Sequence, residues 1–220
     1  MTAVLWSSHF ETELYSLHWD GLAGARDQWP VILRLLLALA KQAESLGRIS
    51  GDLRVVSDHP DGRMFEEWPV TTDATRLQAV LSARSDAPQP VELPLRLEPL
   101  LWLPDDCLDV VDFDLSDDDV IARAELLPVE RVTVDHQGLR AWRLPRQPVE
   151  MLTLGLLFGF DEVPTSLRFE ISTRCDLWRT TQLNGEPGAT YHLANAALLQ
   201  RSIEEIARST NAEITHRPPP

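Results

Sequence analysis

The stretch Trp29–Leu46 most constrains the fold of this chain. Apolar side chains recur there on nearly every face of a helix, with Asp27 suited to its N-cap, Pro30 to its first turn and Gly47 to its end. A helix that is apolar all round is a buried one. The pattern therefore predicts a first central helix over residues 28–46, packed inside other elements.

Elsewhere apolar residues mostly alternate with polar ones, which is typical of half-buried strands. A second major helix, amphipathic, is predicted over 191–207. The predicted strands lie at 3–20 (one or two short strands), 51–57, 63–70, 91–103, 130–134, 139–144, 149–160, 167–171 and 212–215, and a short helix lies at 74–84. Turn-forming residues predict two hairpins, one joining 51–57 to 63–70 and one joining 130–134 to 139–144. We expect an α+β fold with a mixed or antiparallel sheet and two main helices.

Two strands can be placed within the predicted sheet. Strand 91–103 contains Pro94 and Pro99, which predict a sheet edge because proline cannot donate to a ladder. Segment 149–160 is the most hydrophobic run of strand length. We expect it in the sheet interior.

Residues 85–104 hold five prolines in twenty positions and form the best candidate for a domain boundary. We expect either an N-terminal α+β lobe at 1–84 and a C-terminal α+β lobe at 105–220, joined by this connection and edge strand, or one continuous domain. A strand, a Gly-containing loop, a long helix and a short strand follow in that order at 13–56 and again at 167–215. This recurrence predicts two lobes of similar design.

The charge of the chain limits what it binds. The chain has 220 residues, is 44% hydrophobic and carries a formal net charge of −14, which is typical of an acidic globular protein. Recognition of nucleic acid normally needs a basic surface, so we expect no nucleic-acid partner. The same charge repels anionic membrane surfaces. It favours a basic protein partner.

Lysine and cysteine usage exclude further classes. The single lysine, Lys41, lies in a predicted helix without a glycine loop before it, which excludes phosphate-binding loops and Schiff-base chemistry. Cys107 and Cys175 have no CxxC spacing, which argues against a disulfide-stapled secreted fold. The first fifteen residues lack the pattern of a signal peptide, and no apolar run is long enough to cross a bilayer. We expect a cytoplasmic protein.

The seventeen residues Pro104–Val120, called the acidic segment below, contain eight aspartates and no basic residue. Trp102 precedes this segment, and Asp176 and Trp178 repeat the combination of a carboxylate and a tryptophan. We predict that the chain binds a basic protein partner, with complementary charge from the aspartates and apolar anchoring from the tryptophans. The predicted partner-binding residues are Trp102, Asp105, Asp106, Asp109, Asp112, Asp114, Asp117, Asp118, Asp119, Asp176 and Trp178.

Catalytic interpretations have less support in the sequence. Asp112 and Asp114 follow an apolar strand end and suit a metal-dependent hydrolase or transferase, but the lysine and Gly-rich turn that often accompany such sites are missing. The six histidines lack zinc-site spacing. Neither Cys175 nor Ser172 forms a recognisable nucleophile elbow with His192. We therefore expect no enzyme, metal or cofactor, and keep the Asp112/Asp114 enzyme and an assembly or adaptor subunit as alternatives.

A resemblance points the same way. The strand Leu167–Ser172, the element Arg174–Trp178 and Asn195 within the closing helix Tyr191–Ala207 resemble the immunity proteins that bacteria keep beside polymorphic toxins. The resemblance covers roughly Val149–Ile214, about a third of the chain. It implies a small, acidic, non-enzymatic cytoplasmic protein that binds and blocks a cognate toxin.

Overall fold

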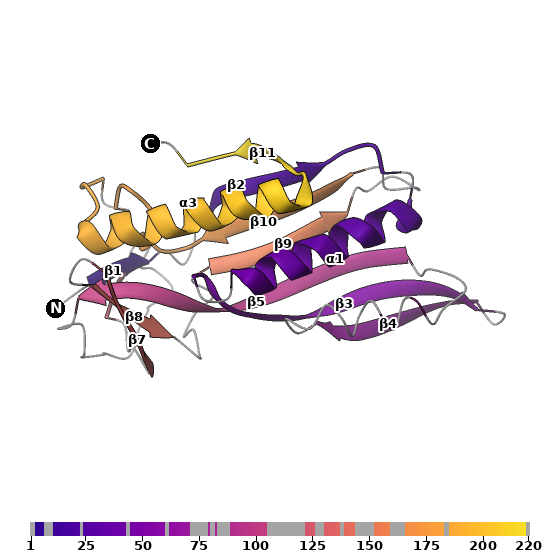
Figure 1. Cartoon of the computed structure of the whole chain (residues 1–220), viewed down its shortest axis with the longest axis horizontal. Coiled ribbons are helices and arrows are strands. Elements are labelled where there is room, and N and C mark those ends of the chain that lie inside the picture. The colour runs from indigo at the N-terminus through magenta and orange to yellow at the C-terminus, as the bar shows by residue number, and fades with distance from the viewer. Residues whose placement is uncertain are drawn as a thin grey trace.

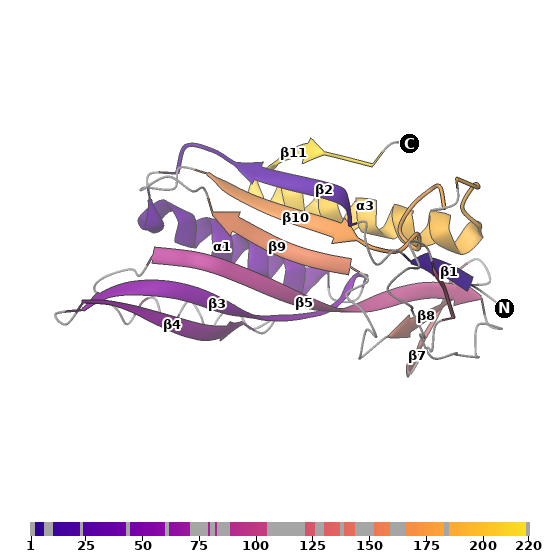
Figure 2. The ribbon, with the colours of Figure 1, turned by 180° about the vertical axis from the view of Figure 1, so that it is seen from behind.

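A computed structural model shows two long helices on one face of an antiparallel sheet (Figure 1). Figure 2 shows the opposite face of the sheet, which we call the outer face. The structure describes residues 3–6, 11–22, 24–42, 45–59, 62–70, 79, 82, 89–104, 122–125, 130–136, 139–143, 152–158, 166–182 and 185–218.

The strands of the main sheet run in the order β11-β2-β10-β9-β5-β3-β4, with β8 beside β5 and β7 beside β8. In chain order the elements are β1 (Ala3–Trp6), β2 (Thr12–Trp19), α1 (Ala25–Lys41), β3 (Gly47–His59), β4 (Gly62–Val70), β5 (Gln89–Pro104), β6 (Ala122–Glu125), β7 (Glu130–His136), β8 (Leu139–Arg143), β9 (Leu152–Phe158), β10 (Leu167–Thr173), α3 (Thr190–Thr210) and β11 (Glu213–His216). β1 pairs with β6 in a separate two-stranded sheet. All these pairings are antiparallel, so the predicted α+β fold with two main helices is confirmed.

The main sheet joins strands from both halves of the chain. β2, from the first half, pairs with β10 from the second, placing Leu17 opposite Phe169. β5 in turn pairs with β9, placing Leu93 opposite Leu156. The sheet is therefore continuous across residues 1–84 and 105–220.

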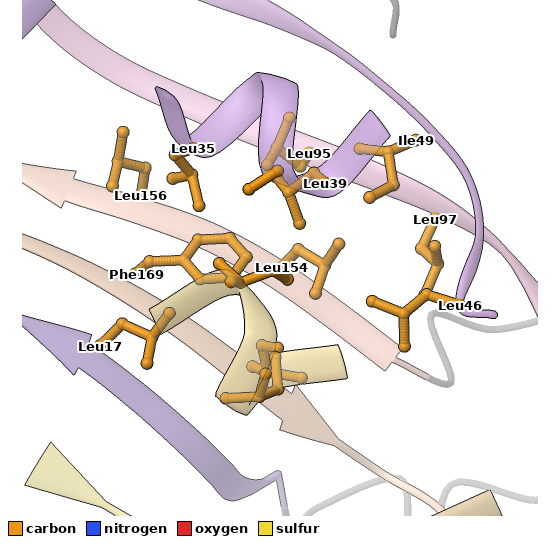
Figure 3. Packing of buried hydrophobic residues seen from close by; sticks show 14 of the residues in the cluster. Leu17, Leu35, Leu39, Leu46, Ile49, Leu95, Leu97, Leu154, Leu156 and Phe169 are labelled. Atoms are coloured by element: carbon orange, nitrogen blue, oxygen red, sulfur yellow. The ribbon is translucent and has the colours of Figure 1, made fainter. Parts of the chain in front are cut away.

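Apolar and polar side chains alternate along the strands, so one face of the sheet is apolar and is covered by the two helices. In β10 the side chains of Leu167, Phe169 and Ile171 are buried, whereas Arg168 between them is exposed. The buried set meets apolar residues of both helices in one core, part of which Figure 3 shows. Leu35 of α1 is one of several fully buried leucines. Replacing any one of them by alanine is expected to lower the free energy of unfolding by about 2–5 kcal/mol.

Helix α1 is shorter than predicted and is not buried all round. It begins at Ala25, with Gly24 and not the predicted Asp27 at its N-cap, and it ends at Lys41. Leu46 lies in a turn just before β3, and its carbonyl accepts the N–H of Leu100 at 2.9 Å. Arg34 and Leu37 are exposed, so α1 has a solvent-facing stripe although its sequence is almost continuously apolar. The all-round burial predicted for this helix is wrong.

Strand β5 lies inside the sheet, so the predicted edge position is wrong. It pairs with β3 and β9, and beyond Leu100 it pairs with β8. Pro94 lies opposite Gly155 of β9, and the described pairs between β3 and β5 are interrupted at Leu93 and Pro94. The interior position predicted for β9 is confirmed, since it lies between β10 and β5.

Both predicted hairpins are confirmed. β3 and β4 pair up to the turn at Gly62, whose φ of 120° favours glycine, and β7 pairs with β8. Of the predicted short helix at 74–84, only Ala79 and Ser82 are among the described residues, and both are helical. A search of the described helices finds none with the length and hydropathy needed to span a membrane.

Candidate functional site

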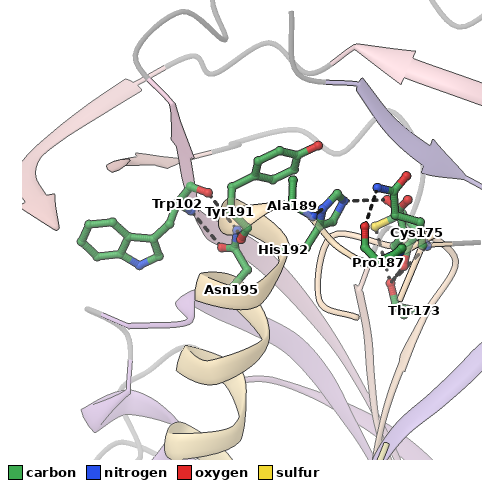
Figure 4. A network of polar contacts seen from close by, with 10 residues as sticks. Trp102, Thr173, Cys175, Pro187, Ala189, Tyr191, His192 and Asn195 are labelled. Carbon is green, nitrogen blue, oxygen red and sulfur yellow. Dashed lines mark hydrogen bonds and ion pairs between the residues drawn. The ribbon is translucent and has the colours of Figure 1, made fainter. Parts of the chain in front are cut away.

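A buried contact between a histidine and a carboxylate lies where α3 meets the segment after β10. The Nε2 atom of His192 is 3.4 Å from Oδ1 of Asp176, and both side chains are almost fully buried. The backbone N–H of Ala189, at the start of α3, donates to Nδ1 of His192 at 2.9 Å (Figure 4). This bond needs a lone pair on Nδ1, so the ring directs its Nε2 proton toward Asp176. The pair thus joins the first turn of α3 to the segment 174–181.

At the same junction the backbone of Gly188 lies very close to that of Thr180. The N–H of Gly188 donates to the carbonyl of Thr180 at 2.8 Å. A Cβ atom on Gly188 would lie 2.9 Å from that carbonyl oxygen and 3.0 Å from Cβ of His192. Only glycine fits here without displacing the backbone, because real Cβ atoms do not approach so closely.

Cys175 is buried next to this pair. Its backbone N–H donates to Oγ1 of Thr173 at 3.2 Å, and the Thr173 hydroxyl donates to the Cys175 carbonyl at 3.1 Å. Burial raises the pKa of the Cys175 thiol to about 12. The thiol is therefore protonated at neutral pH, which is the opposite of what a nucleophilic cysteine needs.

Asn195 of α3 binds the end of β5. Its Oδ1 accepts the backbone N–H of Trp102 at 2.9 Å, and its Nδ2 donates to the Trp102 carbonyl at 2.8 Å and to the Tyr191 carbonyl at 2.7 Å. The amide therefore takes the place of a neighbouring strand along this part of β5. A second apolar cluster forms around this contact, where Trp102 and Ala141 pack near Leu198.

A groove of about 360 Å³ lies between β2, α3 and the segments after β10 and β11. Its lining includes two aromatic side chains, Tyr15 and Trp178, each only 4% exposed. Leu193, which is 48% exposed, belongs to the apolar wall from α3. The remaining lining residues are Thr180, Ala196, Ala197, Gln200, Arg217 and Pro218. The groove therefore combines aromatic and aliphatic surface with a few polar groups, as ligand-binding sites do.

The polar groups of the groove converge on one carboxylate. Nε2 of Gln200 and Nη1 of Arg217 each lie 3.0 Å from Oε1 of Glu204. These bonds, led by that from Gln200, lower the pKa of Glu204. Burial raises the pKa of Tyr15, an effect that nearby Arg217 opposes and Glu204 reinforces. The Tyr15 hydroxyl is thus a protonated donor at neutral pH.

The outer face carries a charged network around Arg168. Its Nη2 donates to both carboxylate oxygens of Glu13, at 3.0 and 3.1 Å. Its Nε donates to Oγ of Ser16 at 2.8 Å and lies 2.7 Å from Oε1 of Glu170. One guanidinium thus joins β2 to β10 through side chains, next to their backbone ladder.

The sequence-predicted partner-binding residues fall into two groups. The aspartates of the acidic segment (105, 106, 109, 112, 114, 117, 118 and 119) lie outside the described residues. Trp102, Asp176 and Trp178 are described, and their exposed fractions are 8%, 0% and 4%. The structure therefore gives these three an internal role: Trp102 packs against α3, Asp176 meets His192, and Trp178 lies in the core beside the groove.

Sequence reasoning missed the most specific contacts. Cys175, Asp176 and His192 are brought together, but in a protein interior rather than as a nucleophile with its base. Nothing in the spacing of Asn195 and Trp102 indicates their contact, because 93 positions separate them. Tyr15 and Arg217 likewise reach the groove from opposite ends of the chain. Within the described ranges, no group of three or more His, Cys, Asp or Glu side chains is placed to hold a metal ion.

Comparison with known proteins adds no relative: no family model matches the chain, and no curated protein or solved structure is significantly similar to it.

Proposed function

We propose that this chain is a non-enzymatic, acidic binding protein that neutralises a basic toxin or effector domain in the bacterial cytoplasm. The observation that carries the proposal is the density of negative charge in the acidic segment, eight aspartates in seventeen residues within a chain of net charge −14. Such a field raises the rate of encounter with a basic surface and disfavours acidic competitors.

The bonding of the reactive side chains supports a binding role. The Cys175 thiol has a raised pKa and is fully buried. Nδ1 of His192 accepts the Ala189 N–H, and Nε2 lies 3.4 Å from Oδ1 of Asp176 in the protein interior. Both side chains are buried away from solvent, which favours a scaffold that presents surfaces to a partner over one that performs nucleophilic chemistry.

The proposal is tested with the product of the adjacent gene. We expect that protein to arrest growth of a bacterial host when expressed alone, and co-expression of this chain to restore growth through a complex that can be purified. Replacement of Asp117, Asp118 and Asp119 by Asn is expected to weaken protection.

A second variant with the same net charge tests whether the position of the removed charges matters. Asp20→Asn, Glu186→Gln and Glu213→Gln together remove the same three negative charges from exposed positions elsewhere. This variant is expected to protect as well as the natural chain. The proposal fails if no complex forms, or if Asp112→Ala and Asp114→Ala abolish a magnesium-dependent turnover by the chain itself.

A further inference from the structure

We propose that the groove beside α3 is a binding site for a small aromatic carboxylate. The described residues that line it lie outside the sequence range of the acidic segment, and the inference does not depend on the identity of a protein partner. It rests on the shape of the groove, on its aromatic surface and on the side chains that gather at its polar end.

The size and lining fit an aromatic ring system. A volume of about 360 Å³ is within the range of small-molecule sites. The nearly buried rings of Tyr15 and Trp178 offer aromatic surface, and Ala196 and Ala197 leave space because their side chains are short. Leu193 adds an exposed apolar wall, which a bound ring would remove from water.

The polar end fits a carboxylate. Gln200 and Arg217, which both line the groove, already converge on a single carboxylate oxygen, that of Glu204. The side chain of Arg217 is 51% exposed and that of Glu204 is 35% exposed. Because exposed ion pairs contribute little free energy, breaking this pair costs little. A ligand carboxylate can therefore take the place of Glu204 as the partner of Arg217. Glu204 acts in the unliganded protein as an internal stand-in for the ligand.

Tyr15 supplies a further donor. Its side chain lines the groove and is only 4% exposed. Burial keeps this hydroxyl protonated because it raises the pKa of Tyr15. A carboxylate at the polar end of the groove can accept from it.

The test uses 2-naphthoate as the probe and its neutral, isosteric amide, 2-naphthamide, as the control ligand. Affinities are measured on the whole chain by titration, followed through the side-chain amide signal of Gln200 in nuclear magnetic resonance. We expect 2-naphthoate to bind about three- to fivefold more tightly than 2-naphthamide, the size of one exposed charge contact. Equal affinity, or tighter binding of the amide, would overturn the assignment.

Two substitutions at the polar end of the groove test the contact with the carboxylate. Arg217→Gln is expected to bring the two ligands to equal affinity. Glu204→Gln is expected to tighten 2-naphthoate by about two- to fourfold, because the competing carboxylate is gone. A merely structural role for the Glu204–Arg217 pair predicts no such gain, and an unchanged or weakened affinity would contradict the proposal.

Ala197→Trp fills the groove from the exposed side of α3 and is expected to abolish binding of both ligands. Leu37→Trp, at a comparably exposed apolar position on α1, is the matched control and is expected to leave both affinities unchanged. If Ala197→Trp leaves the affinities unchanged, the ligands bind elsewhere and the proposal is wrong. Because all four substituted positions are at least partly exposed, the variants are expected to fold, which thermal unfolding checks.

Discussion

The side-chain amide of Asn195 forms two hydrogen bonds with the backbone of Trp102: its Oδ1 accepts the N–H at 2.9 Å, and its Nδ2 donates to the carbonyl at 2.8 Å. These two bonds complete the hydrogen bonding of a strand end that has no backbone neighbour on that side among the described residues. They also fix the position of α3 along β5. The contact therefore sets how the second helix sits on the sheet.

Asn195→Asp tests this contact with almost no change of shape. The carboxylate cannot donate to the carbonyls of Trp102 and Tyr191, so both hydrogen bonds from Nδ2 are lost and a charge is placed at a buried position. We expect the free energy of unfolding in urea to fall by about 2–5 kcal/mol. Gln200→Ala, which removes an exposed amide from the same helix, is the control and should cost about 0.5 kcal/mol or less. An equal fall in the free energy of unfolding for the two variants would show that the hydrogen bonds between Asn195 and Trp102 contribute little to stability.

The Asp176–His192 pair can be tested by a double-mutant cycle. His192→Asn keeps an acceptor for the Ala189 N–H but loses the contact with Asp176, and Asp176→Asn removes the negative charge. We expect each change to destabilise the fold and the two to be coupled by about 1 kcal/mol or more, measured by urea unfolding at neutral pH. Losses that add to within about 0.3 kcal/mol would mean that the two side chains do not interact.

Cys175 should make stability depend on alkaline pH. Its pKa is raised to about 12 in the folded chain, whereas an unfolded cysteine ionises near 8.5. Between these values the unfolded state releases a proton that the folded state keeps, so stability falls as pH rises. We expect the natural chain to lose about 2 kcal/mol relative to Cys175→Ala between pH 7 and pH 10. A constant difference between the two proteins over this range would contradict the shift.

The network around Arg168 should give a salt-dependent contribution. Arg168→Met removes the cation that lies between Glu13 and Glu170 and leaves two like charges near each other. We expect a loss of about 1 kcal/mol at low salt and less at 0.5 M sodium chloride, from urea unfolding. Arg54→Met, which breaks the exposed pair with Glu67, should cost less. A loss at Arg168 that does not respond to salt would point to packing instead of charge.

Local patterns in the sequence were sufficient for the elements whose neighbours are set by turns or by alternation. β10 and the β3–β4 hairpin follow directly from apolar periodicity and turn residues. The interior position of β9 follows from its continuous hydrophobicity. In each case the physical cause acts within about ten residues.

Contacts between distant residues could not be predicted in this way. The prolines of β5 indicated an edge, but β5 lies between β3 and β9, and its pairing with β3 is interrupted at Pro94. Trp178 and Asp176 have the composition of an interface, yet they are buried because α3 covers them. The Asn195 amide is indistinguishable in sequence from a surface amide until Trp102 is placed beside it. Tertiary packing determines all three.

The association rate with the adjacent gene product tests the central claim, recognition of a basic partner through the acidic segment, most directly. It is measured by stopped flow between 0.05 and 0.5 M sodium chloride, for the natural chain and for the Asp117→Asn, Asp118→Asn, Asp119→Asn variant. We predict a fast association that slows steeply with salt for the natural chain, and a slower, flatter response for the variant. Identical rates and identical salt dependence for the two proteins would contradict the account.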